Sequence, residues 1–187
     1  TFLMAALALF PLYFFPSGKP QISDFVFLIF CLMSTLFLIK NKSFKTNGFP
    51  KEWFLLVLVV VIVSTVWAII LQDFKITFHL LFWVFNLLIS YSIYSMLKFD
   101  YSYFIEFVFR GVVFSLLLSA VGMFLYSSGT IRETGFFNNP NQLAYYSLVA
   151  LVIILLIRDF KIEGVYMSLS VISAVLGILL SASISAI

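Results

Sequence analysis

Residues 53–71 read WFLLVLVVVIVSTVWAIIL, a run of 19 residues without an ionisable side chain. An α-helix rises about 1.5 Å per residue, so a run of this length nearly covers the hydrocarbon core of a bilayer, which is roughly 30 Å thick. Backbone groups in hydrocarbon must bond to one another, and a single helix achieves this within one segment. The run therefore predicts a transmembrane α-helix.

The chain as a whole is also rich in hydrophobic residues. Of its 187 residues, 63% are hydrophobic and 10% are charged, and its mean hydropathy is +1.15. Soluble domains are about 45–50% apolar and about 25% charged. We therefore expect an integral membrane protein. Its net charge of +3 does not predict nucleic-acid binding. The single cysteine, Cys31, predicts neither an intrachain disulfide nor a metal site, and the sequence predicts no cofactor.

Seven apolar runs are separated by polar turns, and each predicts a transmembrane helix. They cover residues 2–15, 22–39, 53–71, 76–97, 104–126, 140–157 and 165–187. Pro11 predicts a kink in the first run. A signal peptide is the alternative interpretation of this run, but the run lacks a signal peptide's basic flank and small-residue cleavage site. The predicted fold class is all-α, a polytopic transmembrane bundle over residues 1–187. Because both outer runs are cut off by the sequence ends, we expect part of a longer chain.

The positive residues predict the orientation of these helices. The loops after runs two, four and six hold seven Lys and Arg, whereas the loops after runs one, three and five hold three. Cytoplasmic loops carry the excess of Lys and Arg. We therefore expect a cytoplasmic N-terminus and an outward loop over residues 127–139.

Polar residues inside the runs are candidates for function or for helix packing. In the fourth run, His79, Asn86 and Ser90 share one helix face that we expect to turn inward, with His79 near the outer end. His79 is a candidate substrate-binding or proton-handling group, or alternatively an inter-helix histidine. In the fifth run, Glu106 and Arg110 have the spacing of a helical ion pair.

A ridge of small residues recurs every fourth position in the seventh run. Such ridges allow two helix backbones to approach closely. We therefore expect a partner helix here, either within this chain or outside it. The ridge consists of Ser173, Gly177, Ser181 and Ser185.

The polar stretch between runs five and six, residues 131–146, reads IRETGFFNNPNQLAYY. Gly135 permits a left-handed backbone or close approach of another group. Asn139 is a good N-cap, Pro140 suits the first helical position, and Gln142 has the spacing of a capping box. The sixth helix is thus predicted to begin here with its N-terminus outward.

Arg132 is the only Arg or Lys between runs five and six. A guanidinium beside a helix N-terminus attracts anions, because free amides and the helix dipole add to its charge. At the outer interface the expected anion is a lipid phosphate or pyrophosphate. Two alternatives stay open: Glu133 neutralises Arg132, or the stretch only turns the chain and caps a helix.

The stretch 132–144, RETGFFNNPNQLA, placed between two spans, resembles the O-antigen ligase and O-antigen (capsular polysaccharide) polymerase family. The resemblance covers roughly the N-terminal half of such a protein. It implies a membrane glycosyltransferase of the bacterial cytoplasmic membrane. Such an enzyme uses an undecaprenyl-pyrophosphate-linked oligosaccharide at the outer face of that membrane, without metal or nucleotide sugar. By its position in the motif, Arg132 would be the catalytic or donor-binding arginine. Gly135, Asn139 and Asn141 would bind substrate.

The sequence departs from the family in two places. Ile184 stands where the family often has an arginine after a serine, and the family's large outward loop with further arginines and a histidine is not in these 187 residues. Two other classes therefore remain alternatives. The first is a transporter or flippase for an anionic or lipid-linked solute, and the second is a non-catalytic membrane subunit.

The orientation is testable with a thiol reagent that cannot cross the membrane. In a Cys31→Ser background, we expect Glu133→Cys to be labelled in intact cells and Lys161→Cys to be labelled only after the membrane is opened, because the two residues lie in loops on opposite sides. If Lys161→Cys were labelled in intact cells and Glu133→Cys were not, the helices would have the opposite orientation to the one predicted.

Overall fold

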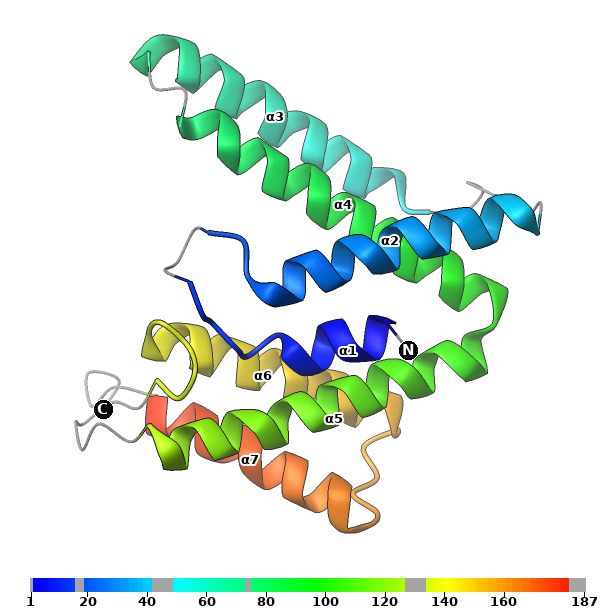
Figure 1. Cartoon of the computed structure of the whole chain (residues 1–187), viewed down its shortest axis with the longest axis vertical. Helices are drawn as coiled ribbons and strands as arrows, with labels where there is room; N and C mark the ends of the chain where they lie inside the picture. Colours follow the sequence, from blue (N-terminus) through cyan, green and yellow to red (C-terminus); the bar gives the residue numbers. More distant parts are fainter. Residues whose placement is uncertain (1, 16–18, 42–48, 73–74, 127–133, 182–187) are drawn as a thin grey trace. The chain divides into compact units, whose positions relative to one another are not determined.

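The computed structural model describes residues 2–15, 19–41, 49–72, 75–126 and 134–181, without the side chains of residues 75–79 (Figure 1). These residues form seven helices and no strand, so the all-α prediction is confirmed. Five helices are long and apolar enough to cross a membrane, within residues 22–40, 51–71, 80–99, 101–125 and 140–157. The helices are α1 (Phe2–Leu9), α2 (Ile22–Lys40), α3 (Lys51–Leu71), α4 (Lys75–Phe99), α5 (Tyr101–Leu125), α6 (Pro140–Ile157) and α7 (Val165–Ser181).

The first helix is much shorter than predicted. We expected a helix over residues 2–15 with a kink at Pro11, but α1 ends at Leu9 and residues 12–14 are not helical. Proline disfavours a helical residue before it and lacks the N–H that a continuing helix would use. The other bounds lie within about three residues of the prediction, except that residues 182–187 of the seventh run lie outside the described residues.

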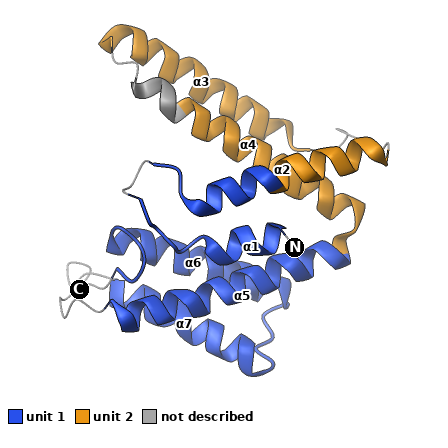
Figure 2. Cartoon of the chain, viewed as in Figure 1, with its two compact units in different colours: residues 1–29, 102–187 blue, residues 30–101 orange. Residues whose placement is uncertain are grey.

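The chain divides into two compact units (Figure 2). Unit one consists of residues 1–29 and 102–187, and unit two consists of residues 30–101. In unit two, α3 packs along α4. The ring of Phe49, just before α3, is buried against the rings of Phe54, Tyr91 and Tyr94 at centroid distances of 5.2–5.4 Å.

One inward-facing prediction in unit two is wrong. Asn86 is exposed and Ser90 is only partly buried within the described part of α4. Few residues of α4 between Leu80 and Phe99 are buried, so most of this helix does not face other described helices.

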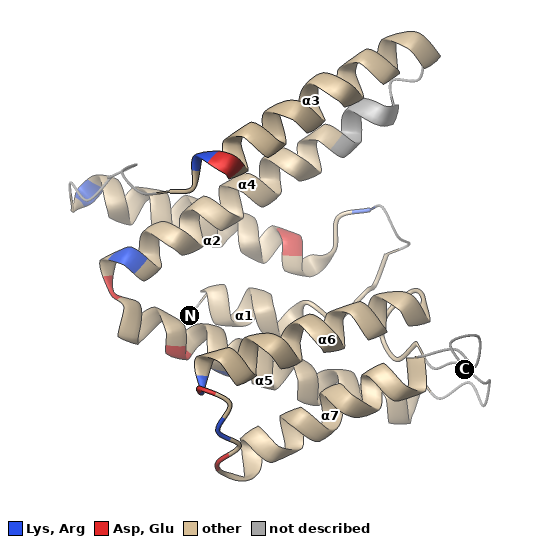
Figure 3. Cartoon of the chain, turned by 180° about the vertical axis from the view of Figure 1, so that it is seen from behind, with Lys and Arg blue, Asp and Glu red and all other residues tan. Residues whose placement is uncertain are grey.

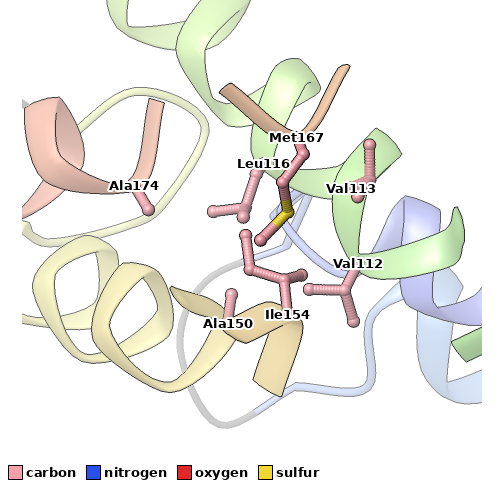
Figure 4. Close-up of a cluster of buried hydrophobic side chains, with 7 residues drawn as sticks. All are labelled: Val112, Val113, Leu116, Ala150, Ile154, Met167 and Ala174. Atoms are coloured by element: carbon pink, nitrogen blue, oxygen red, sulfur yellow. The ribbon is translucent and has the colours of Figure 1, made fainter. Parts of the chain in front are cut away.

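Unit one has its apolar core between α5, α6 and α7 (Figure 4). Helix α1 crosses α5 at Gly111, where an added Cβ would lie 2.9 Å from the Leu7 Cβ and 3.1 Å from the Met4 carbonyl oxygen. Glycine is therefore required for this crossing. The core residues are Val112, Val113, Leu116, Ala150, Ile154, Met167 and Ala174.

Serines are buried among these apolar side chains. The hydroxyls of Ser119, Ser170 and Ser173 donate to the carbonyl oxygens four residues earlier, at 2.7–2.9 Å. Each hydroxyl is thus satisfied within its own helix. Because lipid is as apolar as the protein core, helices in a membrane associate through close packing, which small side chains allow.

The small-residue ridge on α7 packs against α6. Ser173 and Ser181 are buried. Gly177 faces Ser147, whose side chain occupies the space of a Cβ at Gly177, and a Leu143 methyl carbon would be in ordinary contact at 3.6 Å. The partner helix at this position thus belongs to this chain. Ser185, the last residue of the predicted ridge, lies outside the described residues.

We predict that Gly177→Ala destabilises unit one, because the new methyl group meets Ser147. An overpacking cost of about 1–3 kcal/mol should exceed the gain of about 1 kcal/mol from alanine's helix propensity. Thermal unfolding in detergent measures the loss. Ser147→Gly in the same chain should restore most of it, giving a double-mutant coupling of about 1 kcal/mol or more. Equal stability of Gly177→Ala and wild type would contradict this packing.

Candidate functional site

Helix α6 begins as the sequence predicts. The Asn139 side-chain oxygen accepts from the Gln142 N–H at 2.9 Å, and Pro140 occupies the first turn. One of the free amides at this helix end is therefore satisfied by the cap. The positive end of the α6 dipole points toward the loop of residues 134–139.

This loop lies against α5 through two glycines. Gly135 has a φ of +57°, and a Cβ there would lie 3.4–3.6 Å from backbone and side-chain atoms of Gly122 and Met123. At Gly122, the Phe136 ring fills the space that a Cβ would need. Gly135 thus turns the chain, and Gly122 admits the ring of the residue that follows the turn.

The same loop is bonded to the non-helical segment that follows α1. The Tyr13 N–H donates to the Phe136 carbonyl at 3.3 Å, and the Asn138 side-chain amide donates to the Phe15 carbonyl at 3.0 Å. Residues more than 120 positions apart in sequence are joined in this way. The failure of α1 to continue past Leu9 is what makes these backbone groups available.

Gln21 fixes the far end of this segment. Its side chain accepts from the Phe15 N–H at 3.1 Å and donates to the Phe15 carbonyl at 2.9 Å. The Gln21 N–H in turn donates to the Asp24 carboxylate at 2.7 Å, at the start of α2. Gln21 is 5% exposed, so these bonds are shielded from water and hold Phe15 in place.

Four aromatic rings form a continuous row beside the start of α6. Centroid distances are 5.5 Å from Phe10 to Tyr146, 5.3 Å from Tyr146 to Phe137 and 5.3 Å from Phe137 to Tyr13. These are typical distances for interacting aromatic pairs. The Tyr146 hydroxyl is also hydrogen-bonded to the Ser115 hydroxyl of α5, which fixes the row against the core.

A groove of about 510 Å³ lies over this row. None of its lining residues is charged. Asn141 is exposed, and the Tyr145 side chain is 76% exposed at the rim. Amide and phenol groups beside ring faces suit a ligand that has both hydroxyls and apolar C–H faces, such as a sugar. The lining residues are Phe10, Tyr13, Phe137, Asn139, Asn141, Gln142, Tyr145, Tyr146 and Val149.

Of the predicted site residues, the structure brings three together. Asn139 and Asn141 line the groove, and Gly135 shapes its loop. Arg132 lies outside the described residues, two positions before the described loop begins at Thr134. The side chain of His79 is also outside the description, and its backbone belongs to α4 of unit two.

The sequence analysis missed several groups that build this site. Tyr13, Tyr145 and Tyr146 line the groove, the Tyr146 hydroxyl being bonded to Ser115. Asn138 and Gln21 hold its walls. The pair of tyrosines directly after the capped helix start was a usable signal. No signal pointed to Gln21 or Asn138, because residues 10–15 were expected to be helical.

Within the described residues, no three His, Cys, Asp or Glu side chains gather as a metal site. Comparisons of the chain with known protein families, with curated proteins and with solved structures find no match. A functional assignment therefore depends on the groove and on the motif that leads into α6.

We predict that Asn139→Ala lowers stability by about 1 kcal/mol, because the Gln142 N–H loses its acceptor. Asn139→Ser keeps an acceptor and should retain most of the stability. Thermal unfolding in detergent measures the loss, and hydrogen exchange should locate it in the first turn of α6. Equal stability of the alanine and serine variants would show that the cap contributes nothing.

Proposed function

We propose that this chain belongs to a membrane glycosyltransferase of the O-antigen polymerase or ligase type. It would transfer or polymerise undecaprenyl-pyrophosphate-linked glycans at the outer face of the bacterial cytoplasmic membrane. The observation that carries the proposal is the 132–144 motif leading into a capped membrane helix, with an uncharged groove of amides and aromatic rings beside that helix start.

Three features support this function. The apolar helices suit a lipid bilayer, which a polyprenyl-linked donor requires. The N-terminus of α6 favours an anionic group such as a pyrophosphate. The groove offers hydrogen-bonding groups of Asn141 and Tyr145 together with ring faces for a sugar. Anion and glycan chemistry are thus adjacent, as a pyrophosphate-linked sugar needs.

In the proposed reaction, an acceptor hydroxyl oxygen attacks the anomeric carbon of the donor. The bond from that carbon to the pyrophosphate oxygen breaks, and the lipid pyrophosphate leaves with the electron pair. Arg132 stabilises the charge that develops on the leaving group. The hydroxyl proton passes to a base, which would come from the acceptor side of the site. Asn141 and Tyr145 hold the donor glycan.

The test is a polysaccharide ladder from cells that carry variants of the native gene. We expect Arg132→Ala to lower polysaccharide yield by ~100-fold or more, and Asn141→Ala to lower it by about tenfold. Lys40→Ala removes an exposed lysine at the end of α2 and serves as the control with wild-type yield. A normal ladder from well-expressed Arg132→Ala would refute the donor-site assignment.

A second measurement separates transferase from flippase. Loss of a transferase leaves lipid-linked units at the outer face, where periodate added to intact cells oxidises them. Loss of a flippase leaves them inside and protected. Periodate-protected units in Arg132→Ala cells would therefore favour transport over glycosyl transfer.

A further inference from the structure

The opposite end of unit one holds a second cavity. Its volume is about 840 Å³, and it lies between residues 106–117 of α5, the end of α6, the turn that leads to α7 and the start of α7. Figure 3 shows the charged residues of that turn gathered at this end of the unit. Three basic and three acidic side chains line the cavity: Glu106, Arg110, Arg158, Asp159, Lys161 and Glu163.

A network centred on Glu106 uses only some of these charges. Its two oxygens accept from Arg110 at 3.0 Å and from Arg158 at 3.2 Å. The single negative charge of Glu106 therefore neutralises only one of the two positive charges of Arg110 and Arg158. The guanidinium of Arg158 also lies over the Phe109 ring at 4.0 Å, which fixes it at the cavity wall. The Arg110 and Arg158 side chains remain 65% and 43% exposed, so both still have surface for a ligand.

The α6–α7 turn supplies charges of both signs that form no ion pair within the described residues. These are Asp159, Lys161 and Glu163. The turn has an unusual backbone, because Asp159 and Phe160 both have positive φ values, of 48° and 61°. A bond of 2.7 Å from the Phe160 N–H to the Leu155 carbonyl holds it. Left-handed non-glycine residues cost energy and are found preferentially at functional sites.

The rest of the cavity wall is apolar. Phe114 and Leu117 on α5 and Ile157 on α6 line it, and Phe114 is exposed within a candidate membrane span. The cavity thus joins a charged end to a surface that suits lipid. A ligand that matches both parts is an amphiphile with its headgroup among the charges and a chain along the apolar wall.

We propose that this cavity binds a zwitterionic amine phospholipid of the phosphatidylethanolamine class. The phosphate lies against Arg110, Arg158 and Lys161. The primary ammonium donates to the carboxylates of Asp159 and Glu163, and an acyl chain follows Phe114 and Leu117. Equal numbers of acidic and basic residues favour a headgroup with both charges over a purely anionic one, which the two acids would repel.

The choice of a primary amine follows from hydrogen bonding. An ammonium group offers three N–H donors to carboxylates, whereas the quaternary amine of phosphatidylcholine offers none. Both lipids carry the same phosphate and the same net charge. A comparison of the two therefore isolates the role of the acidic pair from general attraction to membranes.

The experiment measures lipid retained by the purified full chain in detergent by native mass spectrometry. The probes are phosphatidylethanolamine, its mono- and dimethylated forms, phosphatidylcholine and the anionic phosphatidylglycerol. We expect phosphatidylethanolamine to bind about tenfold more tightly than phosphatidylcholine, with affinity falling at each methylation. Equal binding along the methylation series, or preferred binding of phosphatidylglycerol, would overturn the proposal without any variant.

Variants then locate the site. Asn tolerates the left-handed backbone of residue 159, so the double variant Asp159→Asn, Glu163→Gln should keep the fold. In this variant we expect the ratio of the affinities for phosphatidylethanolamine and phosphatidylcholine to fall to about one. Arg110→Gln should weaken the binding of phosphatidylethanolamine and phosphatidylcholine by the same factor, because both lipids carry the phosphate. Glu52→Gln, at the exposed start of α3, is the matched control and should leave the ratio unchanged. An unchanged ratio in the folded double variant would refute the site.

Discussion

Every backbone N–H and C=O group in a hydrocarbon layer needs a partner within the protein, and this constraint shapes unit one. A helix satisfies this constraint with hydrogen bonds between its own backbone groups. Helix α1 ends at Leu9, just before Pro11, and the backbone groups of Tyr13 and Phe15 then need partners elsewhere. Gln21, Asn138 and the Phe136 carbonyl provide them. The groove at the start of α6 exists because this non-helical segment is bonded to the loop before α6.

Packing in this unit depends on small residues more than on apolarity. Apolar side chains gain little by leaving lipid for a protein core, so close contact must hold the helices together. Gly111 brings α1 onto α5, Gly122 admits the Phe136 ring, and Gly177 brings α7 against Ser147 of α6. Buried Ser119 and Ser170 keep their hydroxyls bonded within their own helices, whereas the buried Ser147 hydroxyl at the Gly177 contact has no hydrogen-bond partner among the described residues.

The two ends of α6 carry different chemistry. At its N-terminus lies an uncharged groove of amides, phenols and stacked rings. At its C-terminus, Arg158 joins Glu106 and Arg110 of α5 in a network of charges. A helix that spans the hydrocarbon layer separates such groups by about the thickness of that layer, so the two ends of α6 lie in different surroundings.

The sequence by itself determined the helices and the local bonds within them. Long apolar runs predicted the spans, Asn139 and Pro140 predicted the start of α6, and the spacing of Glu106 and Arg110 predicted their ion pair. The groups involved in each of these features lie within a few residues of one another. Pattern alone is therefore enough to predict them.

Only the tertiary structure decided which faces meet. The bond from Arg158 to Glu106 joins residues that are far apart in sequence. The row of rings from Phe10 through Tyr146 and Phe137 to Tyr13 does the same. In a soluble protein the apolar face of a helix marks the core. In these helices apolar residues lie on all sides, since lipid and core are equally apolar. Apolarity therefore does not mark the buried face of these helices, and the small residues of α7, Ser173, Gly177 and Ser181, mark its buried face instead.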